Sequence, residues 1–556
     1  MIRQLSKKQI DEIIAHAQDG DGQEYFELGI RYWDADGVKF NATKASYYFG
    51  MATQKGFVAK IKKLAKQYLK IIDDASIEKY GQEVEKAGIY AYYLGYAYYY
   101  GFGADENVDT ARKMYRVAAK LGVEEGMVAL ANMLSVEDDD DSVKEAIALY
   151  TKAAKMGNEN AAYNLGVFYQ TDKAEDEEGH ADDIKKSLFW YQRALELGDE
   201  SVNFDIGEIY LDGNGVDKDV DKAIEYFTQG AKVDDAACIS MLGALYHDGN
   251  DVEQDYEKAF GYFQKAAKLG NGSAQMLLGD YYHFGRCVEK DDKTAFKWYL
   301  RAANKGFSTA QYNVALCYEN GDGVEKDNNK ALKWYLKAAY NGDVDAQYDL
   351  GVAYDEGSFV EQNDKLAFKW YLCAAENGNP AAMNNVAACY MSGQGTKINA
   401  VKAKEWLEKA VENGLTEAYF PLGNLCYYRA PYDYDEALEC FEAAARNGDA
   451  NALNNLGIAL QEGKCKLTDH VRAVECYKKA IEAGATQAYY NLARSYELGL
   501  GVEYDLKRAA ELYAKAVEFG IVEAIEGLAR VSQKHESEKG VSQQTSQNLK
   551  VRKRKR

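Results

Sequence analysis

The sequence of 556 residues contains only three prolines and no long apolar stretch. With so little proline, helices can run without interruption. A run of about 18 consecutive apolar residues, the minimum for a transmembrane helix, is absent, so we expect no membrane span. Residues 1–21 are amphipathic and lack the apolar core of a signal peptide. These absences predict a cytoplasmic protein.

Motifs that carry catalysis or bind cofactors are also absent. The sequence has no G-x-x-x-x-G-K-[ST] loop, no Cys-x-x-Cys pair and no recognisable nucleophile motif. The six histidines are scattered; His247 and His283 share one register of a repeat, which explains their spacing without a metal. We therefore predict no enzyme activity, no cofactor and no metal site.

The nine cysteines are an odd number at irregular spacings, which argues against a disulfide framework. Cys440 and Cys476 stand where other repeats have Trp, as small buried apolar groups would. We expect reduced thiols, as in an intracellular protein.

Acidic residues outnumber basic ones by 88 to 67, which gives a formal charge of −21. This balance disfavours binding of nucleic acid through its phosphates. A basic protein or extended peptide is the partner that the charge favours.

A unit of 36 residues recurs through most of the chain and is clearest over residues 307–342. Ser308 is expected to cap a first helix, with Gln311 completing a capping box. Gly321 should end this helix, and Asp327 or Asn328 should cap a second helix that ends at Gly342. Each unit is thus predicted to be a pair of helices.

Apolar residues recur at helical spacing in both predicted helices, as Ala331, Trp334 and Tyr335 do in the second. A small residue stands in the middle of each first helix, where it lets two helices approach closely. These small residues are Gly166, Gly207, Gly243, Gly279, Ala315, Gly351, Ala387, Gly423, Gly457 and Ala493. One hairpin cannot bury such a face alone, so the units must stack.

These patterns resemble the Sel-1-like repeat (SLR), a relative of the tetratricopeptide repeat. The matching motifs are A-x-x-x-L-G-x-x-Y at residues 274–282, G-x-G-V at 213–216 and K-A-x-x-W-Y-x-K-A-A-x-x-G at 330–342. The resemblance implies an all-α fold, an αα-hairpin repeat solenoid wound as a right-handed superhelix of about 14 hairpin units. It also implies a scaffold or adaptor role.

We divide the chain into four parts. Residues 1–21 are a lead-in helix, and 22–520 form the solenoid, in which 58–88 is a degenerate unit. Residues 521–531 are a capping helix, and 532–556 are a disordered tail with a basic end. Pro421, within the first helix of its unit, should kink that helix or delay its start.

One tyrosine-rich stretch stands out, YAYYLGYAYYY, which ends in Tyr98, Tyr99 and Tyr100. One helix cannot bury all these rings, so some should reach the surface. Two readings are open: an excess of tolerated repeat-core tyrosines, or an aromatic patch that binds a partner.

Asn or Asp often stands two positions before the small residue, although Asn is not favoured inside helices. By resemblance to tetratricopeptide proteins, this row lines the concave groove and contacts a guest's backbone. The alternative is that these amides bond the neighbouring repeat. The candidates are Asn164, Asp205, Asn313, Asp349, Asn385, Asn455 and Asn491.

The C-terminal string resembles a short nuclear localisation signal, although a plain charged tail is an equal alternative. Its basic residues are Lys550, Arg552, Lys553, Arg554, Lys555 and Arg556. A nuclear location, if the cell is eukaryotic, and contact with nucleic acid are expected only through this tail.

The sequence therefore predicts a non-catalytic interaction scaffold that binds a client on a concave, acidic, Asn-lined face. Two alternatives were considered. One is a hydrolase like some cysteine-rich relatives of the family, and the other is a nuclear or nucleic-acid adaptor acting through the tail.

Overall fold

The computed structural model describes residues 22–34, 42–63, 81–101, 105–137, 139–171, 177–213, 215–430 and 432–537. Within these ranges the regular structure is helical, with no β-strand. The helices are α2 Gln23–Asp34, α3 Ala42–Gln54, α5 Gly81–Tyr100, α6 Val108–Lys120, α7 Glu124–Leu134, α8 Asp140–Met156, α9 Glu159–Thr171, α10 Glu177–Leu197, η2 Glu200–Val202, α11 Asn203–Asp212, α12 Val220–Lys232, α13 Ala236–Asp248, α14 Tyr256–Leu269, α15 Gly272–Phe284, α16 Asp292–Asn304, α17 Ser308–Asn320, α18 Asn328–Tyr340, α19 Val344–Glu356, α20 Asp364–Glu376, α21 Pro380–Ser392, α22 Ala400–Glu412, η3 Thr416–Ala418, α23 Tyr419–Tyr428, α24 Tyr434–Arg446, α25 Ala450–Glu462, α26 His470–Glu482, α27 Gln487–Leu498 and α28 Leu506–Glu518.

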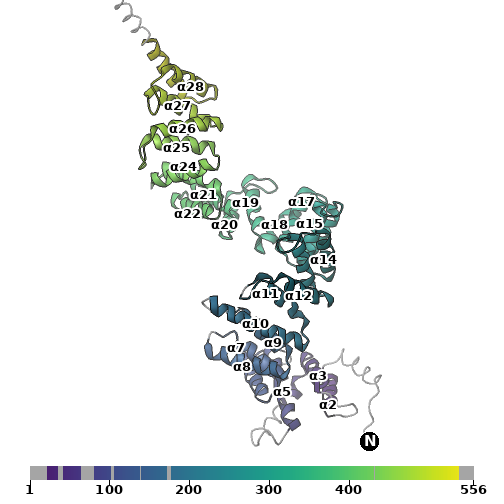
Figure 1. Cartoon of the computed structure of the whole chain (residues 1–556). Coiled ribbons are helices and arrows are strands. Elements are labelled where there is room, and N and C mark those ends of the chain that lie inside the picture. Colours follow the sequence, from purple (N-terminus) through teal and green to yellow (C-terminus); the bar gives the residue numbers. More distant parts are fainter. Residues whose placement is uncertain are drawn as a thin grey trace, which may run out of the picture. The chain divides into compact units, whose positions relative to one another are not determined.

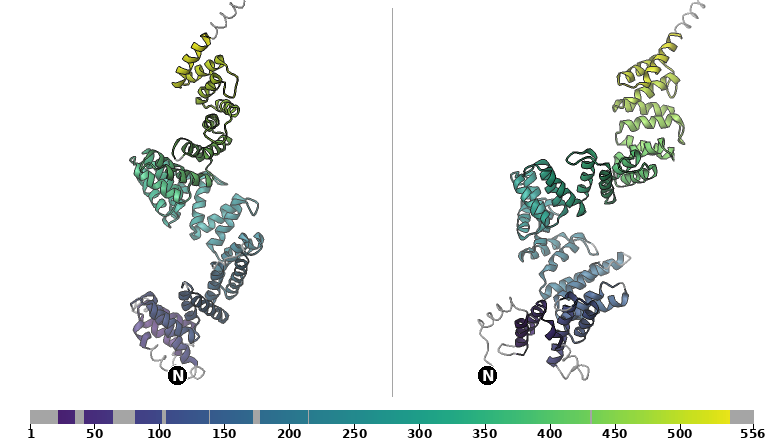
Figure 2. Two further views of the ribbon diagram at one scale, coloured as in Figure 1. Left: turned by 90° about the vertical axis from the view of Figure 1, so that its left-hand side faces the viewer. Right: turned by 180° about the vertical axis from the view of Figure 1, so that it is seen from behind.

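The chain forms two compact units, Met1–Ala274 and Gln275–Arg556. Within each unit, helices that follow one another in the chain pack against one another, as Figures 1 and 2 show. In the first unit α5 packs on α6, α6 on α7 and α7 on α8; in the second, α17 to α22 continue in the same order. The predicted all-α array of stacked αα-hairpins is confirmed.

The hairpin of α17 and α18 shows why this sequence turns where it does. Gly321 ends α17 with φ 89°, a left-handed conformation in which a residue without Cβ is not strained. Asp327 caps α18, because its Oδ1 accepts a hydrogen bond from the Lys330 amide at 3.0 Å. Both positions agree with the prediction from the repeat.

The predicted cap at Ser308 is wrong. Ser308 is already the first residue of α17, and the preceding Phe307 makes no side-chain cap. Gln311 is used differently: its Nε2 donates to the Ala303 carbonyl at 3.1 Å, and its Oε1 accepts from Asn341 at 2.9 Å. The expected capping glutamine is therefore a buried link between successive hairpins.

The small residue in the middle of each first helix is explained by an aromatic ring of the second helix. A Cβ added at Gly279 would lie 2.5 Å from Cε1 of Tyr299. The same close approach recurs between other glycine and ring pairs, at Gly166 and Tyr191, Gly207 and Phe227, Gly351 and Tyr371, and Gly457 and Tyr477. Larger residues at these positions would push the two helices apart.

Buried tyrosines of second helices often bond to polar side chains of the first. Tyr299 donates to Asp280 at 2.7 Å, and Tyr513 donates to Glu497 at 2.8 Å. A buried hydroxyl needs such a partner, since an unpaired one costs free energy. These bonds fix the register within each hairpin.

Several boundaries differ from those expected. Helix α5 begins at Gly81, within the segment 58–88 that was predicted to be a degenerate unit. The capping helix was predicted to end at Val531. The last helix instead runs over residues 523–537. Pro421 lies in the first turn of α23, which follows the short 3-10 helix η3, so the delayed start is confirmed. The predicted lead-in helix at 1–21 lies outside the described residues.

Candidate functional site

All seven Asn and Asp candidates lie on the first helices of their hairpins, and all are half-buried. They are Asn164 on α9, Asp205 on α11, Asn313 on α17, Asp349 on α19, Asn385 on α21, Asn455 on α25 and Asn491 on α27. We call the surface of these helices, together with α5 and α7, the first-helix face. Each unit presents its own part of this face.

Three of these amides hydrogen-bond to a side-chain amide of the preceding hairpin. The donor Nδ2 and acceptor Oδ1 pairs are Asn164 to Asn132 (3.0 Å), Asn455 to Asn424 (2.7 Å) and Asn491 to Asn454 (2.8 Å). These three residues therefore have the alternative role, because their side chains bond to the neighbouring repeat. Each amide keeps further bonding capacity, because it has two N–H donors and an accepting oxygen.

The two carboxylates of the row are less acidic than exposed ones. Asp349 accepts a hydrogen bond from the Tyr312 hydroxyl at 2.8 Å, and burial raises its pKa. Burial also raises the pKa of Asp205 to about 6, and the charges of Asp199 and Asp235 add to this shift. The charge on this face therefore depends on pH near neutrality.

Asn313 and Asn385 differ from the paired amides. The structure shows no hydrogen bond between either side chain and another described residue. For Asn385 the reason is visible in the sequence, since Val352 occupies the place in the preceding hairpin that Asn424 and Asn132 occupy elsewhere. Among the amides of the row, these two therefore have the most hydrogen-bonding groups left for a guest's backbone.

The three candidate tyrosines have different roles. Tyr98 is half-buried against the core, with the Lys62 ammonium 5.4 Å from its ring centroid. Tyr99 and Tyr100 are 38% and 54% exposed at the end of α5. Tyr98 therefore fits the repeat-core reading, whereas the other two are open to a partner.

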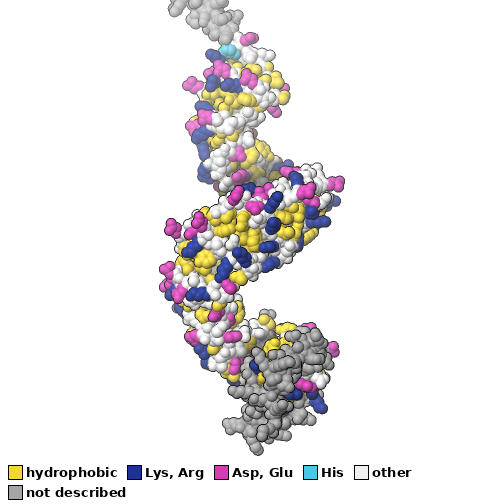
Figure 3. All heavy atoms as spheres, turned by 90° about the vertical axis from the view of Figure 1, so that its right-hand side faces the viewer, with side chains coloured by type: hydrophobic (Ala, Val, Ile, Leu, Met, Phe, Trp, Pro, Cys, Tyr) yellow, Lys and Arg dark blue, Asp and Glu magenta, His cyan; other side chains and the backbone are white. Residues whose placement is uncertain are grey.

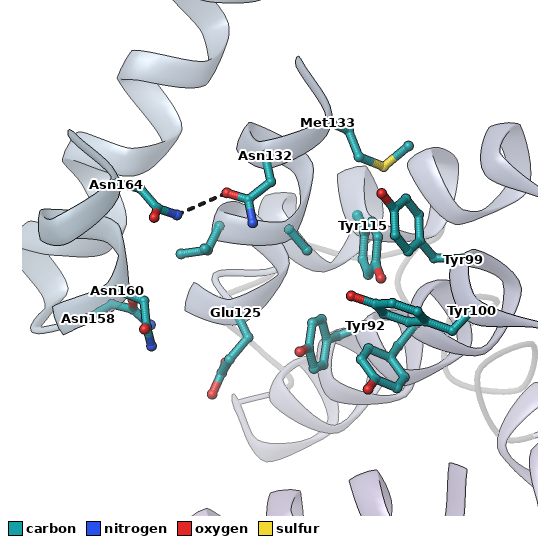
Figure 4. A pocket seen from close by; sticks show the side chains of 13 residues that line it. Tyr92, Tyr99, Tyr100, Tyr115, Glu125, Asn132, Met133, Asn158, Asn160 and Asn164 are labelled. Carbon is teal, nitrogen blue, oxygen red and sulfur yellow. Dashed lines mark hydrogen bonds between the residues drawn. The ribbon is translucent and has the colours of Figure 1, made fainter. Parts of the chain in front are cut away.

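Tyr99 and Tyr100 line a cavity of about 410 Å³ in the first unit, shown in Figure 4. Its wall combines α5, α7, α9 and one tyrosine of α6. The lining residues are Tyr92, Tyr96, Tyr99, Tyr100, Tyr115, Glu125, Val128, Ala129, Asn132, Met133, Asn158, Asn160 and Asn164. Two candidate groups that the sequence kept separate, the tyrosine stretch and the Asn row, thus meet in one cavity.

Five tyrosines form a closed circuit of neighbouring rings at one end of this cavity. The centroid distances are 6.4 Å from Tyr92 to Tyr96, 4.6 Å on to Tyr100, 4.9 Å on to Tyr99, 6.5 Å on to Tyr115 and 5.9 Å back to Tyr92. We call them the tyrosine circuit. In Figure 4 the labelled rings lie on one side, Asn158, Asn160 and Asn164 on the other, and Glu125 and Asn132 between them.

Glu125 is the only charged side chain in the described lining, and it is exposed. Burial, and after it the negative charge of Glu125, raise the pKa of Tyr92 to about 12. The pKa of Tyr115 also lies above its ordinary value, chiefly because of burial. The Tyr92 and Tyr115 hydroxyls are therefore protonated at physiological pH, and Tyr92 lies close enough to feel the negative charge of Glu125.

The two arginines of α6 are paired with glutamates outside the cavity lining. Arg112 pairs with Glu137 at 2.6 Å, and Arg116 pairs with Glu145 at 2.7 Å. The cavity is consequently aromatic, amide-rich and weakly acidic. It suits binding by stacking and hydrogen bonding.

The sequence also led to predictions about the basic tail, the cysteines, metal binding and membrane spans. The candidate targeting residues of the tail, from Lys550 to Arg556, lie outside the described residues. All nine cysteines are free, and burial raises the pKa of Cys389 to about 11. In the described ranges, no cluster of three His, Cys, Asp or Glu could hold a metal, and no helix is long and apolar enough to cross a membrane.

Sequence reasoning missed part of the cavity wall. Tyr115 comes from a second helix, while Glu125 and Asn132 come from the hairpin after the tyrosine stretch. Asn132 could have been predicted from the sequence, because it directly follows the small residue Ala131 of α7, as Asn424 directly follows Gly423 of α23. Glu125 carries no signal of this kind.

Comparison with known families places the repeat units. The Sel1 repeat model matches thirteen segments, and residues 58–88 fall between two of them. The segments are 25–57, 89–123, 141–158, 160–199, 202–235, 236–271, 272–307, 308–343, 344–379, 380–415, 416–449, 450–484 and 486–518.

The chain is also similar to proteins of solved structure. One is c5321, a protective antigen present in uropathogenic Escherichia coli strains and displaying an SLR fold. It is 27% identical over 83% of this chain and 91% of its own, with a TM-score of 0.52. A Sel1 repeat protein from Oxalobacter formigenes is 30% identical over 56% of this chain and 89% of its own, with a TM-score of 0.43. No curated protein matches the sequence.

Proposed function

Because this chain belongs to the Sel1 repeat family, we propose that it is a non-catalytic scaffold that binds an extended segment of a client protein on its first-helix face. Sel1 repeat proteins generally act as protein-interaction scaffolds. The observation that carries the proposal here is the cavity of the first unit. It combines exposed tyrosines with asparagines in a space large enough for several atoms of a guest.

The chemistry of the cavity suits a peptide. Tyrosine supplies large contact area at low entropic cost and is enriched among residues that dominate binding. Asparagine both donates and accepts, so it can bond to both groups of a peptide unit. Asn160 is exposed at the start of α9, and Asn164 lies one turn farther along the same helix.

The second unit offers a similar run of polar groups. Asn313, Asp349 and Asn385 stand on the first helices of three successive hairpins. Asp349 is held by Tyr312, while the two amides have no hydrogen bond to another described residue. An extended guest would meet one such side chain per hairpin, as in other repeat proteins that bind along their length.

The proposal is tested by capturing clients with the full chain and with matched variants. One variant is Tyr99→Ala with Tyr100→Ala, and its control is the exposed Tyr47→Ala of α3. The other is Asn313→Ala with Asn385→Ala, controlled by the exposed Asn304→Ala with Asn329→Ala on second helices.

We expect a defined set of proteins to be captured by the native chain and both controls but lost from at least one of the face variants. Capture that is unchanged in both face variants would overturn the proposal. Far-ultraviolet circular dichroism of each variant shows that its helices are intact.

A further inference from the structure

The tyrosine circuit has the geometry to hold a cation. The negative face of an aromatic ring attracts a positive charge within about 6 Å of its centroid. In the circuit, neighbouring rings are 4.6 to 6.5 Å apart and inclined to one another by 37° to 78°. A cation beside the circuit would lie close to several rings at once.

Charge points to the same ligand. Glu125 is the one charged group in the described lining, and no Lys or Arg contributes to it. The arginines of α6 are held by Glu137 and Glu145. An anionic guest would find no positive charge in this lining and would be repelled by Glu125, whereas a cationic one gains both Glu125 and the rings.

Burial strengthens the attraction. Tyr115 is 3% exposed, and Tyr92 and Tyr96 are half-buried, so this end of the cavity is partly shielded from water. Cation–aromatic attraction is larger where the groups are desolvated. The hydroxyls stay protonated at physiological pH, because the pKa values of Tyr92 and Tyr115 are raised.

We propose that this cavity binds an arginine or lysine side chain of the client, with the cation between Glu125 and the tyrosine circuit and the adjoining peptide units against Asn160 and Asn164. The inference rests on the proposed function and adds the chemical class of the residue recognised. The volume of about 410 Å³ leaves room for a long basic side chain and part of the backbone.

The experiment is selection of binders from a displayed library of random linear peptides, using the full chain. A parallel selection uses the Tyr99→Ala, Tyr100→Ala variant, and Tyr47→Ala serves as the control. Peptides enriched on the native chain are then resynthesised with each Arg or Lys replaced in turn by citrulline or norleucine, which keep similar length without charge.

We expect peptides that share one basic residue, bind the native chain and Tyr47→Ala alike, and lose at least tenfold in affinity on the cavity variant. The neutral replacement of that residue should cost a similar factor, and Glu125→Gln should weaken binding about threefold to tenfold. This attraction should also weaken as salt is added.

The outcomes separate the two claims. Cavity-dependent peptides that share no basic residue, or that tolerate citrulline, would overturn the cation assignment and leave the scaffold proposal standing. If the enriched peptides bind the cavity variant unchanged, or no peptide is enriched, both the assignment and peptide binding at this cavity are wrong.

Discussion

Asn164 Nδ2 donates a hydrogen bond to Asn132 Oδ1 at 3.0 Å, joining two successive hairpins at the wall of the cavity. The Tyr150 hydroxyl donates to the same oxygen. Asn132 thus links α8, the second helix of its own hairpin, to α9, the first helix of the next hairpin.

We predict that Asn132→Ala destabilises this part of the first unit by about 1–3 kcal/mol, because the buried Tyr150 hydroxyl and the half-buried Asn164 amide lose this acceptor. Asn160→Ala should change stability little, since Asn160 is exposed. Hydrogen exchange of α7 to α9 measures the effect locally, because repeat arrays open in parts. Equal protection in both variants would contradict the assignment.

The repeat pattern made the helices and many of their ends predictable. Gly321 and Asp327 are local signals, since a left-handed C-terminal residue and a capping carboxylate act within a few residues of the chain. The cap predicted at Ser308 was wrong because the sequence alone does not distinguish a capping serine from a serine at the first position of a helix. In α19 and α25 the caps are Asp343 and Asp449, at the position that Phe307 fills in α17.

The cavity was only half predictable. The tyrosine stretch and Asn164 could be selected as unusual for a helix, but nothing in the sequence brought them together. Their meeting depends on how α5, α7 and α9 pack, and on Tyr115 entering from α6. Such contacts between hairpins are set by three-dimensional packing and leave no periodic signal.

A second prediction concerns the glycine opposite Tyr299. Gly279→Ala should destabilise the second unit by about 1–3 kcal/mol, because the new methyl group would lie 2.5 Å from the ring. Gly261→Ala in α14 is the matched control: nothing lies within 4 Å of its added Cβ. It should stabilise by about 0.5–1 kcal/mol through helix propensity. Urea unfolding of the two variants would contradict the packing argument if both shifts had the same sign.

A third prediction follows from Asp205. Its pKa is raised from 3.8 to about 6, so between these values the folded chain binds a proton that the unfolded chain releases. Its contribution to stability is therefore greatest below about pH 4 and is lost as pH rises through about 6. Asp205→Asn should raise the unfolding temperature at about pH 7.5 and change it little at about pH 4.

The control for Asp205 is Asp217→Asn, an exposed carboxylate in the turn that follows α11. It should shift the unfolding temperature little at either pH. A gain of stability in Asp205→Asn that is the same at both pH values would show that burial of the charge is not the cause.

A fourth prediction concerns the last helix. The Glu497 side chain, 4% exposed, accepts two hydrogen bonds from Arg530, at 2.7 and 2.8 Å, and one from Tyr513. Arg530→Met would leave a buried charge without its partner, so residues 523–537 should lose protection from hydrogen exchange. Arg508→Met, which removes an exposed ion pair, should have little effect.

The same pair predicts a pH response. Arg530 lowers the pKa of Glu497, so its stabilising contribution is present above the ordinary value of 4.5 and is lost as pH falls below it. Protection of residues 523–537 should therefore fall on acidification in the native chain. In Arg530→Met, acidification should not cause this further loss of protection from hydrogen exchange.

The scaffold proposal places a client on the first-helix face at the cavity. The most direct measurement places a photoreactive benzoylphenylalanine at Tyr100 or, as a control, at Tyr47, both exposed tyrosines of the first unit. After irradiation in the cell, mass spectrometry identifies the cross-linked partner and its residue. The account predicts one client joined to position 100, next to an Arg or Lys of that client, and no such adduct at position 47. The same adduct at both positions, or at position 47 alone, would contradict it.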